Sequence, residues 1–257
     1  MRAGRHINAP GTTIAGKPMI KLLLVFLTGL LMSFSAFAES LFKDNPPIGT
    51  VMVQQIETPH GQVMLPKGNW TLAGVKTFDA DGPYPLGKAV LARIGQDHTL
   101  DGLIFLTVSL NDGADYHPGT EKWCARNSDA RFFRAIAPSA PSETGCLVLE
   151  ELVSRFDNLT PPHFKQASSY LADRKIVHPD TMFFATFQIA RDHQFLSVSY
   201  GFDFRLPPTE MLPGYAPSND TRYDGPYSDL TRQSNFDLVV DWAQATKTEI
   251  HRAFVNR

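Results

Sequence analysis

Cysteine and clustered positive charge are both scarce in this sequence, and each shortage excludes a class of function. The chain has only two cysteines, Cys124 and Cys146, and no Cys-x-x-Cys pair of the kind that carries out thiol redox chemistry or binds zinc. It also has no run of lysines or arginines, which argues against a nucleic-acid polyanion as the main partner. We therefore expect neither a thiol-based active site nor nucleic-acid binding.

The short motifs of the common enzyme classes are missing as well. The sequence has no Gly-x-Ser-x-Gly nucleophile elbow, no His-Glu-x-x-His zinc motif and no glycine loop for phosphate or dinucleotide binding. The eight histidines are scattered, and several lie beside turns or helix ends, where exposure is the default. The sequence therefore leans towards a non-enzymatic protein and predicts no cofactor and no metal site.

What the sequence does contain, near its start, is a predicted export signal at residues 19–38. Lys21 precedes an apolar run that ends in Ala36-Phe37-Ala38, the small-x-small pattern that signal peptidase cleaves. An uncleaved membrane anchor is the alternative, because the run approaches the length that spans a bilayer. Polar and small residues within the run favour cleavage. Residues 1–18 have no apolar periodicity and are interpreted as an upstream extension, disordered or not native.

Residues 39–257 are predicted to form a single exported α+β domain, periplasmic or secreted, with no membrane span after cleavage. The whole chain has 24 basic and 26 acidic side chains, and residues 1–38 hold four of the basic ones, which leaves 20 against 26 and a net charge of −6. In an exported chain two cysteines predict one disulfide, here between Cys124 and Cys146. Closing that loop would stabilise the fold by about 3 kcal/mol in the chain-entropy model.

Residues 181–204 carry the clearest alternation of apolar and polar side chains and are predicted to form a β-hairpin with a turn at residues 191–194. One face holds large apolar residues. The other face is polar and consists of Thr186, Gln188, Ser197, Ser199 and Asp203. If this polar face lines a cavity, we expect the functional site there; if it meets bulk water, the hairpin is only scaffold.

The remaining periodicities predict the rest of the fold. Trp70 and Trp242 are expected to be core anchors, and residues 102–110, apolar on both faces, a central strand. The other predicted strands are 50–57, 63–65, 70–78 and 88–94, and the predicted helices are 127–136, 160–174 and one that starts at Ser234 or Asn235. Residues 147–156 fit a helical stripe or a strand, and the short run favours a strand. We therefore predict a twisted antiparallel sheet of about six to eight strands, packed by two to three helices and tied by one disulfide.

Residues 111–117 hold the densest set of groups capable of acid–base chemistry or metal binding. Asp112, Asp115 and His117 are accordingly weak catalytic candidates, although a solvated loop explains their polarity more simply. His178 and His193 are candidates only if the fold brings other polar groups beside them.

Residues 205–235 have no sustained periodicity, and a structureless stretch of that length is often functional. Its three tyrosines, Tyr215, Tyr223 and Tyr227, are interleaved with aspartates and are the candidate ligand-binding residues, suited to stacking on a sugar or a peptide. The alternative is an irregular excursion whose tyrosines pack on the sheet.

Two functional hypotheses follow. The first is a non-enzymatic exported protein that binds an envelope component or a protein partner, with residues 205–235 as its binding surface. The second is an envelope-directed hydrolase that uses the Asp/His loop at residues 111–117. The lack of an activated nucleophile favours the first.

Overall fold

The computed structural model describes residues 41–43, 46–78, 84–111, 115–205 and 229–255. The chain divides into two units, and all of these residues belong to the second, Ala38–Arg257. The predicted export signal and the extension before it lie outside the described residues, so both remain predictions.

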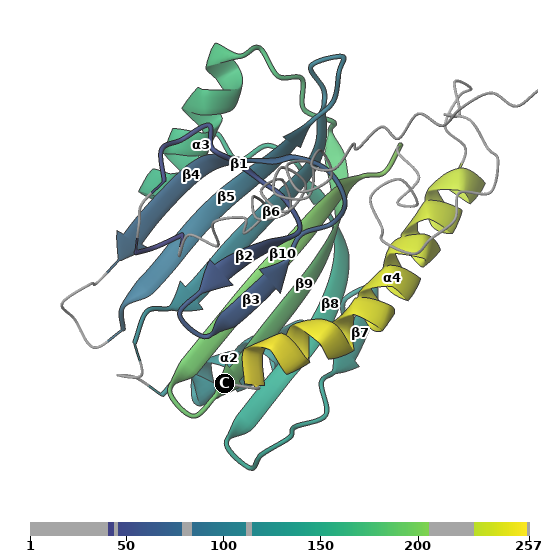
Figure 1. Ribbon diagram of the computed structural model, residues 1–257. Helices are drawn as coiled ribbons and strands as arrows, with labels where there is room; N and C mark the ends of the chain where they lie inside the picture. The colour runs from purple at the N-terminus through teal and green to yellow at the C-terminus, as the bar shows by residue number, and fades with distance from the viewer. Residues whose placement is uncertain (1–40, 44–45, 79–83, 112–114, 206–228, 256–257) are drawn as a thin grey trace, which may run out of the picture. The chain divides into compact units, whose positions relative to one another are not determined.

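The fold is built on one eight-stranded antiparallel sheet (Figure 1), with strand order β1-β4-β5-β6-β10-β9-β8-β7. Its strands are β1 (Val51–Met52), β4 (Trp70–Phe78), β5 (Leu86–Ile94), β6 (Leu100–Ser109), β7 (Phe132–Ala135), β8 (Glu143–Val153), β9 (Thr181–Arg191) and β10 (Gln194–Asp203). A separate hairpin consists of β2 (Gln55–Thr58) and β3 (Gly61–Met64). With three described helices and one disulfide, the structure confirms the predicted α+β fold.

The predicted hairpin at residues 181–204 is confirmed as β9 and β10, with Phe187 opposite Val198. Asp192 and His193 connect the two strands, and Asp192 has a φ of 51°, a left-handed conformation that aspartate adopts more readily than most residues. On its other side β10 pairs with β6, so both strands lie in the interior of the sheet. The hairpin is therefore paired with neighbouring strands along both of its edges.

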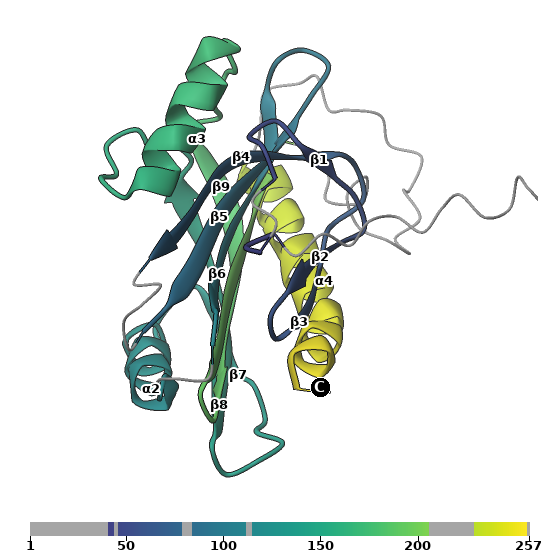
Figure 2. The same cartoon turned by 60° about the vertical axis from the view of Figure 1, so that its left-hand side comes forward.

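One face of the sheet, here called the first face, is covered by the helix α4 (Asp229–Val255) and the β2–β3 hairpin (Figure 2). Trp242 of α4 is 7% exposed and makes edge contacts with the rings of Tyr200 and Phe202, at centroid distances of 5.2 and 4.9 Å. Trp70 is fully buried on the same face, where its indole N–H donates to the carbonyl of Pro66. Both tryptophans are core anchors, as predicted.

Near its C-terminal end, α4 is fixed to β8 by a buried polar contact. Nε2 of His251 contacts the carboxylate of Glu143, which also accepts hydrogen bonds from the backbone N–H and the hydroxyl of Ser139. Burial alone would raise the pKa of Glu143, but the hydrogen bonds from Ser139 and His251 hold it below the usual value. The carboxylate is thus kept ionised and ties the helix to the sheet.

The opposite, second face is covered by two shorter helices, α2 (His117–Arg126) and α3 (Pro162–Asp173), as Figure 2 shows. α3 packs against β4 at Gly74, where an added Cβ would lie 2.1 Å from the carbonyl oxygen of His163, so only glycine permits this approach. α2 is joined to β8 by the Cys124–Cys146 disulfide. Each helix has its own apolar cluster beneath it.

Between α2 and α3 runs a row of polar side chains, the polar strip, which consists of Lys88, Thr107, Thr186, Gln188, Ser197 and Ser199. Gln188 is 8% exposed and the other five are half-buried. The hydroxyl of Thr186 donates to that of Ser199 across the strands, at 2.8 Å. The polar face of the predicted hairpin is therefore not fully exposed to bulk water. Its residues also line neither the hollow at the end of the sheet nor the one beside α3.

Three sequence-based predictions of secondary structure were wrong. The last helix begins at Asp229, earlier in the chain than the predicted start at Ser234 or Asn235. Residues 127–136 do not form a helix, because they include strand β7, in which Phe132 and Phe133 pack on opposite faces of the sheet. The helix precedes them, as α2. Residues 50–57 do not form one strand either, because a left-handed Gln54, with φ of 67°, separates β1 from β2.

Candidate functional site

At one end of the sheet three separate connections of the chain surround an open hollow of about 380 Å³, here called the tip depression. The connections are β6–α2, β7–β8 and the β9–β10 turn. The lining residues are Asp115, His117, Pro141, Ser142, Asp192 and His193. Two carboxylates, two imidazoles and a hydroxyl thus meet in one solvent-accessible place.

Asp115 and His117 are positioned by the start of α2. Oδ1 of Asp115 accepts a hydrogen bond from the backbone N–H of His117, at 2.9 Å. Such a contact satisfies one of the N–H groups that a helix leaves unpaired in its first turn. Asp115 therefore shapes the loop, while the His117 side chain is half-buried at the edge of the depression.

Asp192 and His193 come from the tight turn between β9 and β10. Both are exposed, and the hydroxyl of Ser142, from the β7–β8 connection, donates to Oδ1 of Asp192. A hydroxyl that donates to a carboxylate is held in place but is not aligned with an imidazole base. The described hydrogen bonds thus brace the depression rather than assemble a nucleophile and its base.

An aromatic stack lies beside the depression. The ring of Tyr116, between the two loop candidates, stacks on Phe195 with centroids 5.3 Å apart and an interplanar angle of 27°. Tyr84 contacts the ring of Tyr116 edge-on at 6.0 Å and is 54% exposed. The depression therefore has a rigid apolar neighbour with one accessible ring, a combination found in many binding sites.

The structure brings together only some of the residues that the sequence singled out. Asp115 and His117 lie with His193, which was a candidate only if the fold supplied other groups. Asp112 lies outside the described residues. The ligand-binding candidates Tyr215, Tyr223 and Tyr227 also lie outside them, so their role remains a prediction.

Sequence reasoning missed Ser142 and Asp192. Asp192 belongs to a turn that the sequence did predict, and the missing information was which other loops share its end of the sheet. In an antiparallel sheet that information is the strand order. Because β10 pairs with β6 in the antiparallel direction, the last residues of β6 and the β9–β10 turn must lie at the same end of the sheet.

The tip depression holds oxygen and nitrogen groups that bind polar ligands, but not in the arrangement of a preformed metal centre. Over the ranges that the structure describes, no group of three or more His, Cys, Asp or Glu side chains is placed to hold a metal ion. Carboxylates accept hydrogen bonds from hydroxyl and N–H groups, and neutral imidazoles both accept and donate. The arrangement is therefore suited to hydrogen-bonded recognition.

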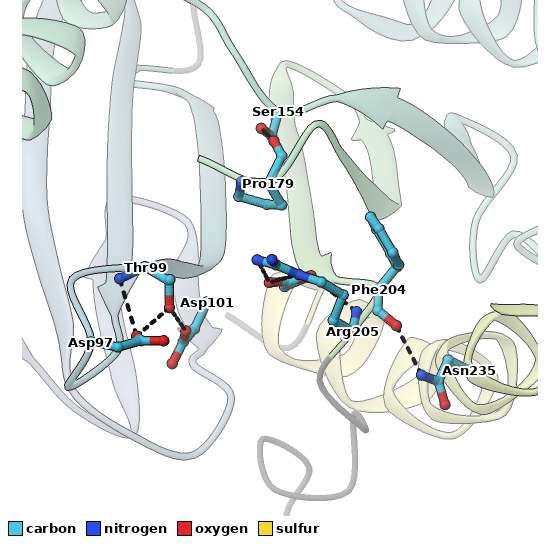
Figure 3. Close-up of polar contacts among 9 residues, drawn as sticks. Asp97, Thr99, Asp101, Ser154, Pro179, Phe204, Arg205 and Asn235 are labelled. Atoms are coloured by element: carbon cyan, nitrogen blue, oxygen red, sulfur yellow. Dashed lines mark hydrogen bonds and ion pairs between the residues drawn. The ribbon is translucent and has the colours of Figure 1, made fainter. Parts of the chain in front are cut away.

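A second polar cluster lies at the opposite end of the sheet (Figure 3). The hydroxyl of Thr99 lies 2.5 Å from Oδ1 of Asp97 and 3.0 Å from Oδ1 of Asp101. Burial raises the pKa of Asp101, against the lowering effects of the Thr99 hydrogen bond and the nearby Arg93. These contacts close the β5–β6 turn on itself, which is a structural role.

At the same end of the sheet, an ion pair and a hydrogen bond hold the residues that flank residues 206–228. Asp203 is 2% exposed and forms a bidentate ion pair with Arg205, with Nη2 and Oδ2 2.6 Å apart. The side chain of Asn235 in α4 donates to the carbonyl of Phe204, as Figure 3 shows. The end of β10 is thereby tied to the first turns of α4.

Comparison with known proteins adds no assignment. No protein-family model, curated protein or solved structure matches the chain. Of the helices in the described part of the chain, none combines the length and the apolar character needed to cross a membrane.

Proposed function

We propose that this is an exported, non-enzymatic binding protein of the periplasm or the extracellular space, and that the tip depression is its recognition surface for an envelope component. The observation that carries the proposal is the convergence of three connections, distant in sequence, on one accessible polar hollow beside a rigid aromatic stack. Binding residues commonly lie on loops that a rigid scaffold positions. The disulfide agrees with an oxidising compartment.

The chemistry of the depression favours a partner rich in hydroxyl and amide groups. Asp192 and Asp115 offer carboxylate oxygens as acceptors, and His117 and His193 offer imidazole nitrogens. The exposed ring of Tyr84 adds an apolar surface on which a sugar ring packs well. An envelope glycan presents both features, so we take it as the ligand class.

The test is co-sedimentation of the mature protein, residues 39–257, with insoluble cell-wall glycan. The double variant Asp192→Asn and His193→Gln removes one charge and one imidazole, and asparagine tolerates the left-handed backbone at residue 192. We expect at least about tenfold weaker binding, equivalent to about 1.4 kcal/mol.

The matched control is His98→Asn, which changes an exposed histidine of left-handed conformation at the opposite end of the sheet. It should bind glycan as the unchanged protein does. Equal binding by all three folded proteins, or no sedimentation of the unchanged protein, contradicts the proposal.

Hydrolysis of an envelope polymer by the same groups is the second candidate, because Asp115 and His117 do lie in an accessible hollow. Two contacts weigh against it. Asp115 is engaged by a backbone N–H, and Ser142 donates to a carboxylate instead of an imidazole. Release of soluble fragments by the unchanged protein, abolished in an Asp115→Asn and His117→Gln variant, would establish the hydrolase and overturn the non-enzymatic proposal.

A further inference from the structure

A second hollow, here called the α3 cavity, lies away from the tip depression and has a volume of about 260 Å³. It forms where the β8–α3 connection, the last turns of α3 and the α3–β9 connection meet. Phe156 and Ile176 supply an apolar wall and are 4% and 9% exposed. The cavity therefore has the size and the lining for a small ligand with an apolar group.

The same cavity is lined by an imidazole with an unused nitrogen. Nδ1 of His178 is buried and has no hydrogen-bond partner in the part of the chain that the structure describes. Burial lowers the pKa of His178, against a hydrogen bond with the backbone of Ser154. The ring is therefore neutral at neutral pH. A neutral ring does not repel a positively charged group in the cavity.

Charges of both signs line the cavity beside this ring. Arg155 and Asp157 both contribute to the lining, and both act electrostatically on His178, Arg155 lowering and Asp157 raising its pKa. They are two residues apart in the chain, and both are exposed. A ligand that carries both a carboxylate and an ammonium group matches this pair.

From these three features we infer that the α3 cavity binds a small zwitterion, a free amino acid with an apolar side chain. Its carboxylate pairs with Arg155, its ammonium group pairs with Asp157, and it lies beside the neutral ring of His178. Its side chain lies against Phe156 and Ile176. This site goes beyond glycan recognition and is independent of it.

The experiment is calorimetric titration of the mature protein with leucine, N-acetyl-leucine and leucine methyl ester. The acetyl derivative lacks the positive charge and the ester lacks the negative one. We expect leucine to bind at least about tenfold more tightly than either derivative, since each has lost one charge-assisted contact. Glycine, which has no apolar side chain, should bind more weakly than leucine.

Two variants assign the charges to their partners. Arg155→Gln should weaken leucine and N-acetyl-leucine about tenfold and leave the methyl ester unchanged, whereas Asp157→Asn should weaken leucine and the ester and leave the acetyl derivative unchanged. The matched controls are Arg174→Gln and Asp173→Asn, exposed charges at the end of α3 that do not line the cavity. Neither should alter binding.

A spectroscopic readout places the ligand beside the imidazole. Leucine should shift the NMR signals of the His178 ring, and those of His193, at the other end of the sheet, should stay unmoved. No binding of leucine at millimolar concentration, equal binding of all three leucine probes, or weakening by the control variants as strong as by Arg155→Gln and Asp157→Asn would each overturn the inference.

Discussion

The two faces of the sheet are covered in different ways, and both proposed sites involve the helices of only one face. On the first face the 27-residue helix α4 and the β2–β3 hairpin lie over one continuous apolar cluster. On the second face α2 and α3 cover separate apolar clusters and leave the polar strip between them. Each hollow is lined in part by α2 or α3. Among the described residues, no residue of α4 lines either hollow. Both proposed binding sites thus involve the helices of the second face.

The largest effect is expected from Trp242→Ala on the first face. Trp242 packs on the rings of Tyr200 and Phe202 in the middle of the continuous cluster, so its removal leaves a cavity that the sheet cannot close. We expect a loss of about 3–5 kcal/mol in the free energy of unfolding, measured by urea titration.

The matched variant is Trp123→Ala, because Trp123 is half-buried against the disulfide cluster on the second face. A smaller cluster beside solvent can relax, so we expect less than half the loss seen at Trp242. Equal losses would show that both faces stabilise the fold to the same extent and would break the comparison.

A second prediction concerns pH and the second face. His163 of α3 is 3% exposed, and burial, together with the charge of Lys88, lowers its pKa from 6.5 to about 4. The folded protein therefore favours the neutral ring. Stability is full above pH 6.5 and falls as the pH drops towards 4, because the unfolded chain takes up the proton first. The total loss from this ring is about 3 kcal/mol.

The variant His163→Phe keeps an aromatic ring beside Phe78 and Phe164 but removes the titrating group. Urea unfolding at pH 7, 5.5 and 4.5 should show a smaller loss of stability on acidification than in the unchanged protein. Other acidic groups titrate in both proteins, so the difference between the two curves isolates His163. Parallel curves would mean that the α3 cluster does not hold the imidazole neutral.

The elements predicted correctly from the sequence are those whose apolar residues recur with a single period and form one buried face. The β9–β10 hairpin, α3 and the core role of Trp242 belong to this group. β7 was mistaken for part of a helix because Phe132 and Phe133 are adjacent apolar residues that pack on opposite faces. α2 was missed because only Thr120 and Cys124 are buried in it, which leaves almost no apolar stripe.

The site was harder to predict than the fold because it depends on strand order. Asp115 and His193 are far apart in sequence, and each lies in a polar connection that looks like an ordinary turn. They become neighbours only because β10 pairs with β6. Local periodicity carries no such information, so sequence reasoning could name individual candidates but could not assemble them into a site.

The smallest effect is expected in the polar strip, where the hydroxyls of Thr186 and Ser199 pair across β9 and β10. The double variant Thr186→Val and Ser199→Ala replaces both partners with apolar groups of similar shape. Removing a hydrogen bond in this way is nearly neutral, so the free energy of unfolding, measured by urea titration, should change by less than about 1 kcal/mol.

Thr186→Val alone leaves the half-buried hydroxyl of Ser199 access to water and should cost equally little. A loss approaching that of Trp242→Ala would show that the strip holds the second face together.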